Sequence, residues 1–231
     1  MNYFAHGHPY VDDPWFLLGT AVPDLLNVAD RGVRVRSKHA ATWCDDADPR
    51  VAAIARGIVR HHADDAWFHE TRAFSDLSLD FTVRVRDALG NDAGFRPSFL
   101  GHILVELLLD AALMAEDPAR MTAYYAAWES VDPSVVESAV NRMAARPTER
   151  LTYVVGMFAR ERFLWDYADD GRLWFRLNQV MRRVGLPQLP REVSHLFASA
   201  RQAVAARRDC LLAERVAAAT HHAHPPSRSL S

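Results

Sequence analysis

The hydrophobic pattern of the chain shows almost no two-residue alternation of the kind that marks half-buried strands. Only GVRVRS at 32–37 and LTYVV at 151–155 hint at a strand. Residues 97–114, in contrast, are apolar almost all round, which is typical of a buried helix. The pattern therefore predicts an all-α fold.

Asp-Pro pairs mark where helices are expected to begin: Asp13-Pro14, Asp48-Pro49, Asp117-Pro118 and Asp132-Pro133. Aspartate is a strong N-cap, and proline suits the first helical position, where its missing N–H costs nothing. Pro97 and Pro147 are expected to open two more helices, and Pro23 is expected to end one, leaving Asp24 at a turn. The predicted helices are 14–20, 49–73, 76–89, 97–115, 118–129, 133–145, 147–168, 171–184 and 190–218.

The size of the chain favours one compact multi-helix domain. With 231 residues and 49% hydrophobic content it can bury a full core. We expect residues 1–219 to form the domain. Residues 220–231 are polar and contain prolines, so we expect a disordered tail, whose His221, His222 and His224 are candidate metal scavengers.

Composition narrows the class of protein. The net charge of -2 gives no general nucleic-acid signal. Cys44 and Cys210 are isolated and are interpreted as reduced thiols. The N-terminus does not have the pattern of a secretory signal, and no apolar stretch approaches the ~20 residues of a membrane span. We expect a cytoplasmic protein.

Two rows of histidines and acids carry the candidate chemistry. His61, Asp65 and His69 are spaced by four, so they share one helix face with a rise of about 6 Å per step. His102, Glu106 and Asp110 repeat this spacing on the apolar helix. A buried carboxylate is paired or holds a metal, so the rows are either salt bridges to arginines or facing walls of a metal site.

The first row predicts more than one ion. The Cα atoms of His61 and His69 would lie about 12 Å apart, too far to share one ion comfortably, whereas two ions could meet near Asp65. Asp110 is expected to orient a ligand histidine. Zinc, manganese or iron suits such a mixed donor set. Further candidate metal ligands are His6, His8, Asp24 and His39.

The segments MNYFAH-H, LLG followed by an aspartate, and GIVRHHADD resemble the acyl-carrier-protein phosphodiesterase family, HD-like metal hydrolases. The resemblance covers roughly the first 110 residues. It departs from the family at His69, where an acid is more usual, and at Gly101-His102, where Asp-His is expected.

The ligand order also resembles zinc-dependent phospholipase C and P1-type nuclease, which are all-helical and bind three zinc ions. The residues that follow the same ligand order in this chain are Asp24, His39, His61, Asp65, His69, His102 and Glu106. Those proteins use their own N-terminus as a ligand, which Met1 does not obviously supply, so the His6/His8 segment could stand in. Both resemblances imply metal-dependent cleavage of a phosphoester or phosphodiester.

The expected mechanism is attack by a metal-activated water on phosphorus. Asp65 is central to this mechanism. Candidates to neutralise the phosphate oxygens are Arg34, Arg36 and Lys38. The leaving group would be protonated by His62 or Asp64. His62 and Asp64 point away from the row and are otherwise interpreted as solvated residues or residues that support the ligands. Arg34, Arg36 and Lys38 could equally form a basic surface loop.

The segment 175–187 adds Arg176, Arg182 and Arg183. A basic segment of this kind suits an acidic carrier protein as partner, or is a solvated helix face. Two other functions remain open. A di-iron or HD-type oxygenase would use similar ligands, although no Glu-x-x-His pair with a matching partner occurs. A non-catalytic helical interaction protein would use the rows as salt bridges.

Overall fold

Each of the four Asp-Pro pairs opens a helix in the computed structural model, which describes residues 1–213. The four aspartate side chains accept hydrogen bonds from backbone N–H groups in the first helical turn, as their sequence context predicts. The helices that they cap are α2 (Pro14–Ala29), α4 (Pro49–Glu70), α7 (Pro118–Glu129) and α8 (Pro133–Met143).

The described residues form an all-α domain without strands, which confirms the predicted fold class. The other α-helices are α1 (Tyr3–Gly7), α3 (Ser37–Ala41), α5 (Arg72–Ala88), α6 (Pro97–Glu116), α9 (Leu151–Glu161), α10 (Asp170–Arg183), α11 (Phe197–Ala206) and α12 (Arg208–Leu211). Short 3₁₀ helices are η1 (His8–Tyr10), η2 (Ala93–Phe95), η3 (Phe163–Ala168) and η4 (Arg191–Leu196). The tail expected at 220–231, with its histidines, lies outside the described residues.

Several predicted helix boundaries are wrong, including the start of the helix predicted at 76–89, which begins at Arg72. Pro23 lies inside α2, which continues to Ala29 because Leu25 and Leu26 are fully buried and their burial outweighs the roughly 3 kcal/mol cost of the proline. Asp24 is therefore on a helix and not at a turn.

The helix predicted at 147–168 begins only at Leu151, because the backbone N–H of Thr148 bonds the Asn141 side chain on α8. It then breaks at Arg162, whose φ of 46° is left-handed. The helix predicted at 190–218 is divided within the described residues into η4, α11 and α12.

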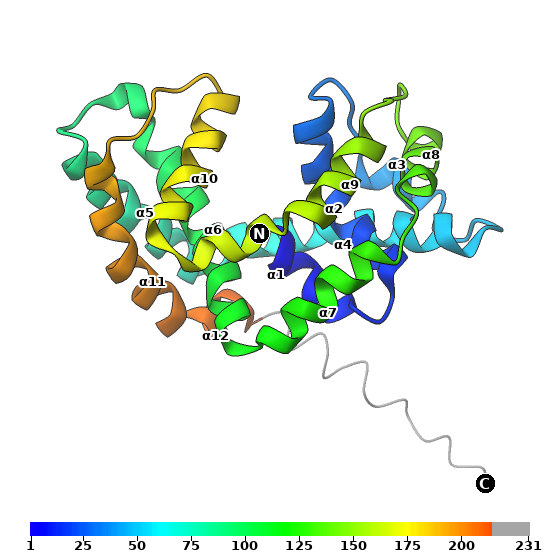
Figure 1. Ribbon diagram of the computed structural model, residues 1–231, viewed down its shortest axis with the longest axis horizontal. Helices are drawn as coiled ribbons and strands as arrows, with labels where there is room; N and C mark the ends of the chain where they lie inside the picture. Colours follow the sequence, from blue (N-terminus) through cyan, green and yellow to red (C-terminus); the bar gives the residue numbers. More distant parts are fainter. Residues whose placement is uncertain (214–231) are drawn as a thin grey trace, which may run out of the picture.

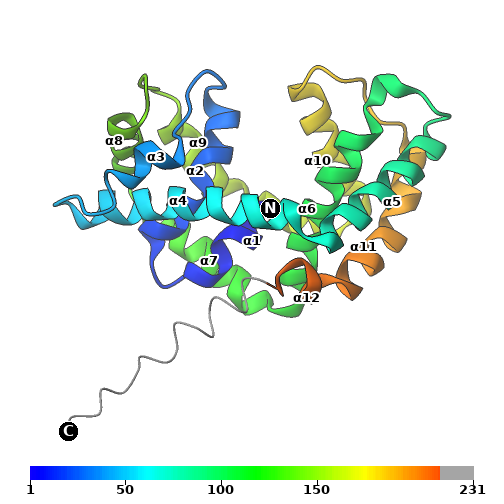
Figure 2. The ribbon, with the colours of Figure 1, turned by 180° about the vertical axis from the view of Figure 1, so that it is seen from behind.

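The helices pack mainly as two pairs, α2 along α4 and α5 along α6. In Figures 1 and 2 these pairs lie on opposite sides of the molecule, and α1 with the N-terminus lies between them. Gly19 and Gly57 make the first pair unusually close, since a Cβ on Gly57 would lie 2.3 Å from the Phe16 carbonyl oxygen. This close crossing brings the backbone of α2 against the middle of α4.

The expectation that no apolar stretch approaches the length of a membrane span is wrong for helix α6. Its 20 residues, with a mean hydropathy of 1.7 in the most apolar window, are long and apolar enough to cross a membrane. However, 61% of that window is buried inside the protein, and a core helix passes the same test. Burial in the core accounts for its composition.

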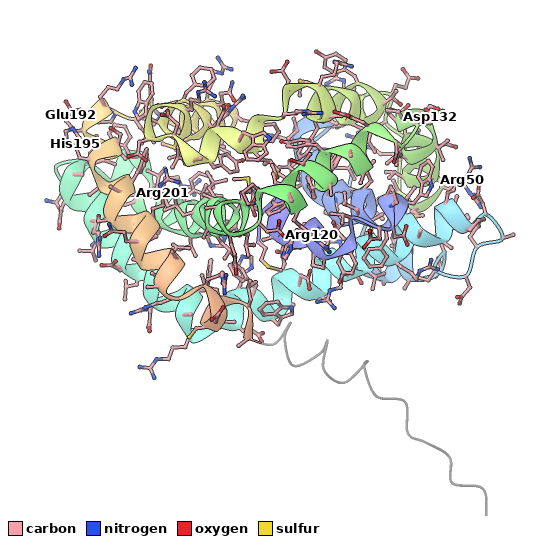
Figure 3. The ribbon with its side chains drawn as sticks, turned by 60° about the horizontal axis from the view of Figure 1, so that its bottom comes forward. Arg50, Arg120, Asp132, Glu192, His195 and Arg201 are labelled. Atoms are coloured by element: carbon pink, nitrogen blue, oxygen red, sulfur yellow. The ribbon has the colours of Figure 1, made fainter. Side chains whose placement is uncertain are left out.

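The N-terminal segment is fixed to the core by polar contacts. The buried carboxylate of Asp110 accepts hydrogen bonds from the backbone N–H groups of Phe4 (3.0 Å) and Ala5 (2.7 Å) and from the Asn2 side chain. Arg120 donates to the carbonyls of His8 and Pro9 and is labelled in Figure 3. These bonds hold the first ten residues at the centre of the molecule, beside α4 and α6.

Candidate metal centre

Two groups of metal-ligand side chains meet near the N-terminus. The first group is His6, His61 and Asp65, and the second group is His69, His102 and Glu106. In each group, one potential ligand atom from every residue lies within 4.8 Å of the others. The two rows that the sequence predicts thus contribute to two neighbouring sets of donors.

The first group is enclosed and its histidines are oriented. The His61 Nδ1 atom lies 2.8 Å from the Thr20 carbonyl oxygen and its Nε2 atom lies 3.4 Å from Asp65. The His6 Nε2 atom lies 3.2 Å from the same carboxylate, and the two imidazole rings stack at 4.2 Å. A carbonyl on Nδ1 places the proton there and leaves Nε2 of His61 free to bind a metal.

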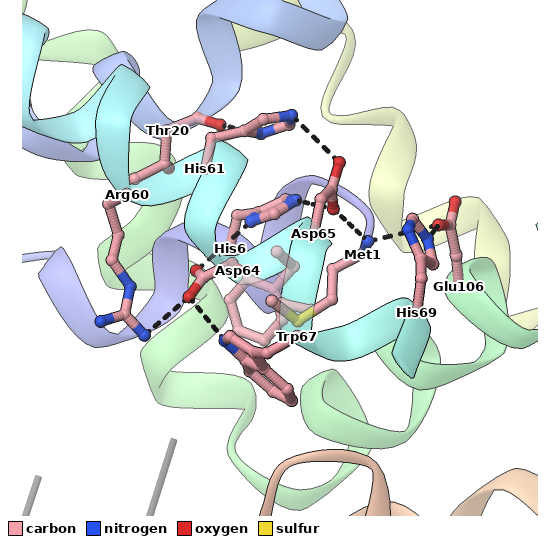
Figure 4. Close-up of polar contacts among 12 residues, drawn as sticks. Met1, His6, Thr20, Arg60, His61, Asp64, Asp65, Trp67, His69 and Glu106 are labelled. Carbon is pink, nitrogen blue, oxygen red and sulfur yellow. Dashed lines mark hydrogen bonds and ion pairs between the residues drawn. The ribbon is translucent and has the colours of Figure 1, made fainter. Parts of the chain in front are cut away.

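Asp64 supports the first group from behind. It is fully buried, pairs with Arg60 at 2.6 Å and lies 3.4 Å from the Nδ1 atom of His6 (Figure 4). The interpretation of Asp64 as a solvated residue is wrong, because His6 and Arg60 enclose it. A carboxylate on the far nitrogen of a ligand histidine orients the ring and makes it more basic.

The second group is more open to solvent. The Nε2 atoms of His69 and His102 lie 3.0 and 3.3 Å from the same oxygen of Glu106. Their side chains are 33% and 39% exposed, whereas those of His6 and His61 are 0% and 4% exposed. Phe74 packs against both imidazoles of the second group. The imidazoles of the second group are thus the more accessible ones, whereas its carboxylate is less exposed than that of the first group, 13% for Glu106 against 32% for Asp65.

The α-amino group of Met1 lies between the two groups. Its nitrogen is 2.7 Å from Asp65 and 3.2 Å from Glu106 (Figure 4). The Met1 amine therefore contacts one carboxylate of each group. The sequence gives no signal for it, because the position of a chain end depends on contacts with residues far along the chain.

The charges at the centre are strongly coupled. Burial alone would raise the pKa of Asp65, but hydrogen bonds from His6 and His61 hold it well below the usual range. Burial likewise opposes ionisation of Glu106, yet the Met1 ammonium and the two histidines hold its pKa well below normal. Burial also disfavours the charged amine, but Glu106 and Asp65 raise the pKa of the Met1 amine from 8.0 to about 10. Cations are thus favoured between the two carboxylates.

The spacing of the donor atoms suits metal ions. A tetrahedral ion with bonds of about 2.0–2.2 Å requires ligand atoms roughly 3.3–3.6 Å apart. The nitrogen–oxygen separations in the two groups are 3.0 to 3.4 Å. Imidazole with carboxylate is also a donor set that zinc, manganese and iron accept. The residues present therefore fit one ion in each group.

The predicted arrangement of the rows needs one correction. Helices α4 and α6 do not face each other along their lengths: α4 packs on α2, and α6 packs on α5. They meet where His69, near the end of α4, reaches Glu106. The row 61/65/69 is consequently divided, with His61 and Asp65 in the first group and His69 in the second.

Four predicted metal ligands lie outside both groups. Asp110 accepts hydrogen bonds from the backbone of α1, His8 packs beside Phe4, and His39 is exposed on α3. Burial raises the pKa of Asp24, which is electrostatically coupled to His61 and His6. No third group of ligands occurs within residues 1–213, so the three-ion order is not reproduced there.

The structure also shows where the predicted catalytic side chains outside the two ligand groups lie. His62 is partly buried, and its Nε2 atom lies 3.0 Å from the Val35 carbonyl oxygen. Arg34, Arg36 and Lys38 are exposed, and none of them forms an ion pair in the described part of the chain. Asp64 is buried behind His6 and pairs with Arg60.

Comparison with known proteins does not assign a family. No protein-family model matches the sequence, and neither the curated proteins nor the solved structures give a match.

Proposed function

We propose that the protein is a metal-dependent phosphoric ester hydrolase that holds one divalent ion in each of the two groups. The observation that carries this proposal is the convergence of four imidazoles and two carboxylates at ligand spacing, in two adjacent groups joined through the Met1 amine. Neighbouring ions are suited to binding the attacking and the leaving oxygen of a phosphoryl group.

The roles of the side chains follow from their contacts. His6, His61 and Asp65 bind the enclosed ion, and the Thr20 carbonyl and Asp64 orient the two imidazoles. His69, His102 and Glu106 bind the open ion, where substrate and water have access. When bound, the ions supply charge to the phosphate oxygens and lower the pKa of water.

The resemblance to acyl-carrier-protein phosphodiesterases suggests one substrate, the phosphodiester of an acidic carrier protein. The exposed Arg182 and Arg183 support this part of the proposal, because they offer positive charge to such a partner.

The test is elemental analysis of protein purified without a histidine tag, followed by hydrolysis of para-nitrophenyl phosphate and bis(para-nitrophenyl) phosphate. We expect two divalent ions per chain and an activity that chelation removes and metal restores. Glu106→Gln should lower the activity about 100-fold, because a neutral amide is a poor ligand for a hard cation. The matched control is Glu70→Gln, an exposed acid beside His69, which should change neither readout.

A second candidate, a helical interaction protein without metal, is favoured by one observation. In each group the histidines lie beside the carboxylate, and the carboxylates bind the Met1 ammonium, so the network has its own internal partners. Protein without metal, with a melting temperature that chelation does not change, would select this candidate and reject the hydrolase.

A further inference from the structure

Two segments far apart in the sequence bring positive charge together at the C-terminal ends of α2 and α10. The Arg31 side chain, just after α2, donates a hydrogen bond to the backbone carbonyl of Arg183, the last residue of α10. In Figure 1, α2 and α10 extend upward on either side of the N-terminus, and this hydrogen bond connects their C-terminal ends. We define the basic rim as Arg31, Arg34, Arg36, Lys38, Arg182 and Arg183.

The basic rim is exposed and not neutralised. All six side chains are exposed, and none of them pairs with an acidic side chain within residues 1–213. Most other arginines that the structure describes are paired with an aspartate or a glutamate, for example Arg60, Arg142 and Arg176. Like charges gathered without partners repel one another, and a bound anion relieves that repulsion.

The segment that carries most of the rim is held rigidly. Val33 and Val35 are buried and anchor it, so that Arg34 and Arg36 alternate outward. This anchoring explains the alternation in GVRVRS without a strand. Arg146 also donates to the Gly32 carbonyl at 3.1 Å. Guanidinium groups on a fixed backbone lose less freedom when they bind an anion.

The rim lies close to the metal centre. The Val35 carbonyl oxygen is 3.0 Å from the His62 ring, which lies 5.4 Å from the ring of the ligand His61. At the end of α10, Arg183 acts electrostatically on Tyr3, two positions from Met1. Burial raises the pKa of Tyr3, and the charge of Arg183 lowers it. Both segments that carry the rim therefore lie near residues beside the metal centre.

We propose that the basic rim binds a second anionic group of the substrate, beyond the phosphorus that is cleaved. This inference rests on the proposed hydrolase function, because it places that phosphorus at the metal centre. The substrate class becomes a phosphoester whose other end carries a phosphate, sulfate or carboxylate. Arginine forks suit such oxyanions, and an uncharged alcohol would gain nothing from the rim.

The test uses two substrates that differ only in this charge: para-nitrophenyl hexyl phosphate and its analogue whose alkyl chain ends in a carboxylate. With the metal-loaded protein, KM should be about three- to fivefold lower for the carboxylate ester, a difference within the range of exposed charge pairs. In the triple variant Arg31→Gln/Arg182→Gln/Arg183→Gln this preference should fall clearly, because half of the charge of the rim is removed, with the hexyl ester cleaved as before.

Two controls separate charge from folding. The triple variant to lysine keeps the charges and should keep most of the preference. Arg86→Gln removes an exposed arginine on α5 that forms no ion pair in the described residues, and should have no effect. An equal KM for both esters in the unmodified protein would overturn the proposal, as would a preference that is unchanged in the glutamine variant.

Direct binding separates this inference from the proposed function. Calorimetric titration of the two esters into the same proteins measures the charge preference whether or not they are cleaved. Binding with the expected preference but without cleavage would reject the hydrolase function and retain an anion-binding rim. Cleavage of both esters with no preference in binding would retain the hydrolase and reject the rim.

Discussion

At the scale of single residues, Asp65 and His69 differ although they lie one helical turn apart. Asp65 contacts two imidazoles and the Met1 amine, whereas His69 contacts only Glu106 and the rings beside it. The same row of side chains therefore contains a central and a peripheral ligand.

We expect Asp65→Ala to lose more metal than His69→Ala. Removing Asp65 deprives the first group of its only carboxylate and releases the amine that also binds Glu106, whereas removing His69 affects the second group alone. Elemental analysis should find close to no metal in Asp65→Ala and about one ion in His69→Ala. Equal metal content in the two variants would show that Asp65 does not support the second group through the Met1 amine.

The Met1 amine predicts how the stability of the metal-free protein depends on pH. Folding raises the pKa of the amine from 8.0 to about 10, so its stabilising contribution is fully present below pH 8 and is lost as the pH rises toward 10. A shift of this size corresponds to about 3 kcal/mol in the free energy of unfolding.

Urea unfolding at several pH values between 7 and 10 measures this loss. A chain with an acetylated N-terminus lacks the titrating group, so its stability should be lower at pH 7 and nearly constant over the window. Parallel curves for the two proteins would show that another group is responsible.

At the scale of elements, the metal centre depends on how closely α2 and α4 approach each other. The Thr20 carbonyl reaches His61 only because Gly19 and Gly57 place the two backbones in contact, with no Cβ between them. A glycine in a helix is usually a cost in conformational entropy. Here it allows an α2 carbonyl to orient a ligand on α4.

Gly57→Ala is expected to destabilise the protein by about 1–3 kcal/mol and to weaken binding in the first group, because the new Cβ would meet the Phe16 carbonyl. Gly156→Ala on α9 is the matched control, since its Cβ would approach only the flexible end of Arg160. The control should be neutral or stabilising by up to about 1 kcal/mol. Thermal unfolding and metal titration of both variants provide the comparison, and similar losses in both would refute the role of the crossing.

At the scale of the whole molecule, the centre forms only when distant parts of the chain assemble. The Met1 amine contacts residues 64 and 105 positions away, and the two groups differ in how far the surrounding fold covers them. The first group lies between α1, α2 and α4, whereas the second opens to solvent at the junction of α4 and α6.

This difference predicts that the ions leave in order. A chelator should remove the ion of the second group first and that of the first group only later, because a closed site exchanges its metal more slowly than an open one. Metal content and activity followed over time after chelator is added should show activity lost with the first ion released. Simultaneous loss of both ions would indicate a single cooperative site.

Local signals in the sequence determined the helical fold and much of the ligand set. Asp-Pro pairs act through hydrogen bonds within one turn, and spacings of four place side chains on one face by helix geometry alone. These are short-range effects, so they can be read without the fold. They gave the helix starts at Pro14, Pro49 and Pro97, and the residues that supply most of both groups.

Only the tertiary structure decided which of these residues meet. It divided the row 61/65/69, selected His6 and not His8, turned Asp110 into an anchor for α1 and placed the Met1 amine between Asp65 and Glu106. Each outcome depends on contacts between helices that are far apart in the sequence, and burial was strong enough to carry α2 through Pro23. Helix periodicity sets the direction of a side chain from its own axis, but the packing of the core sets what lies opposite it.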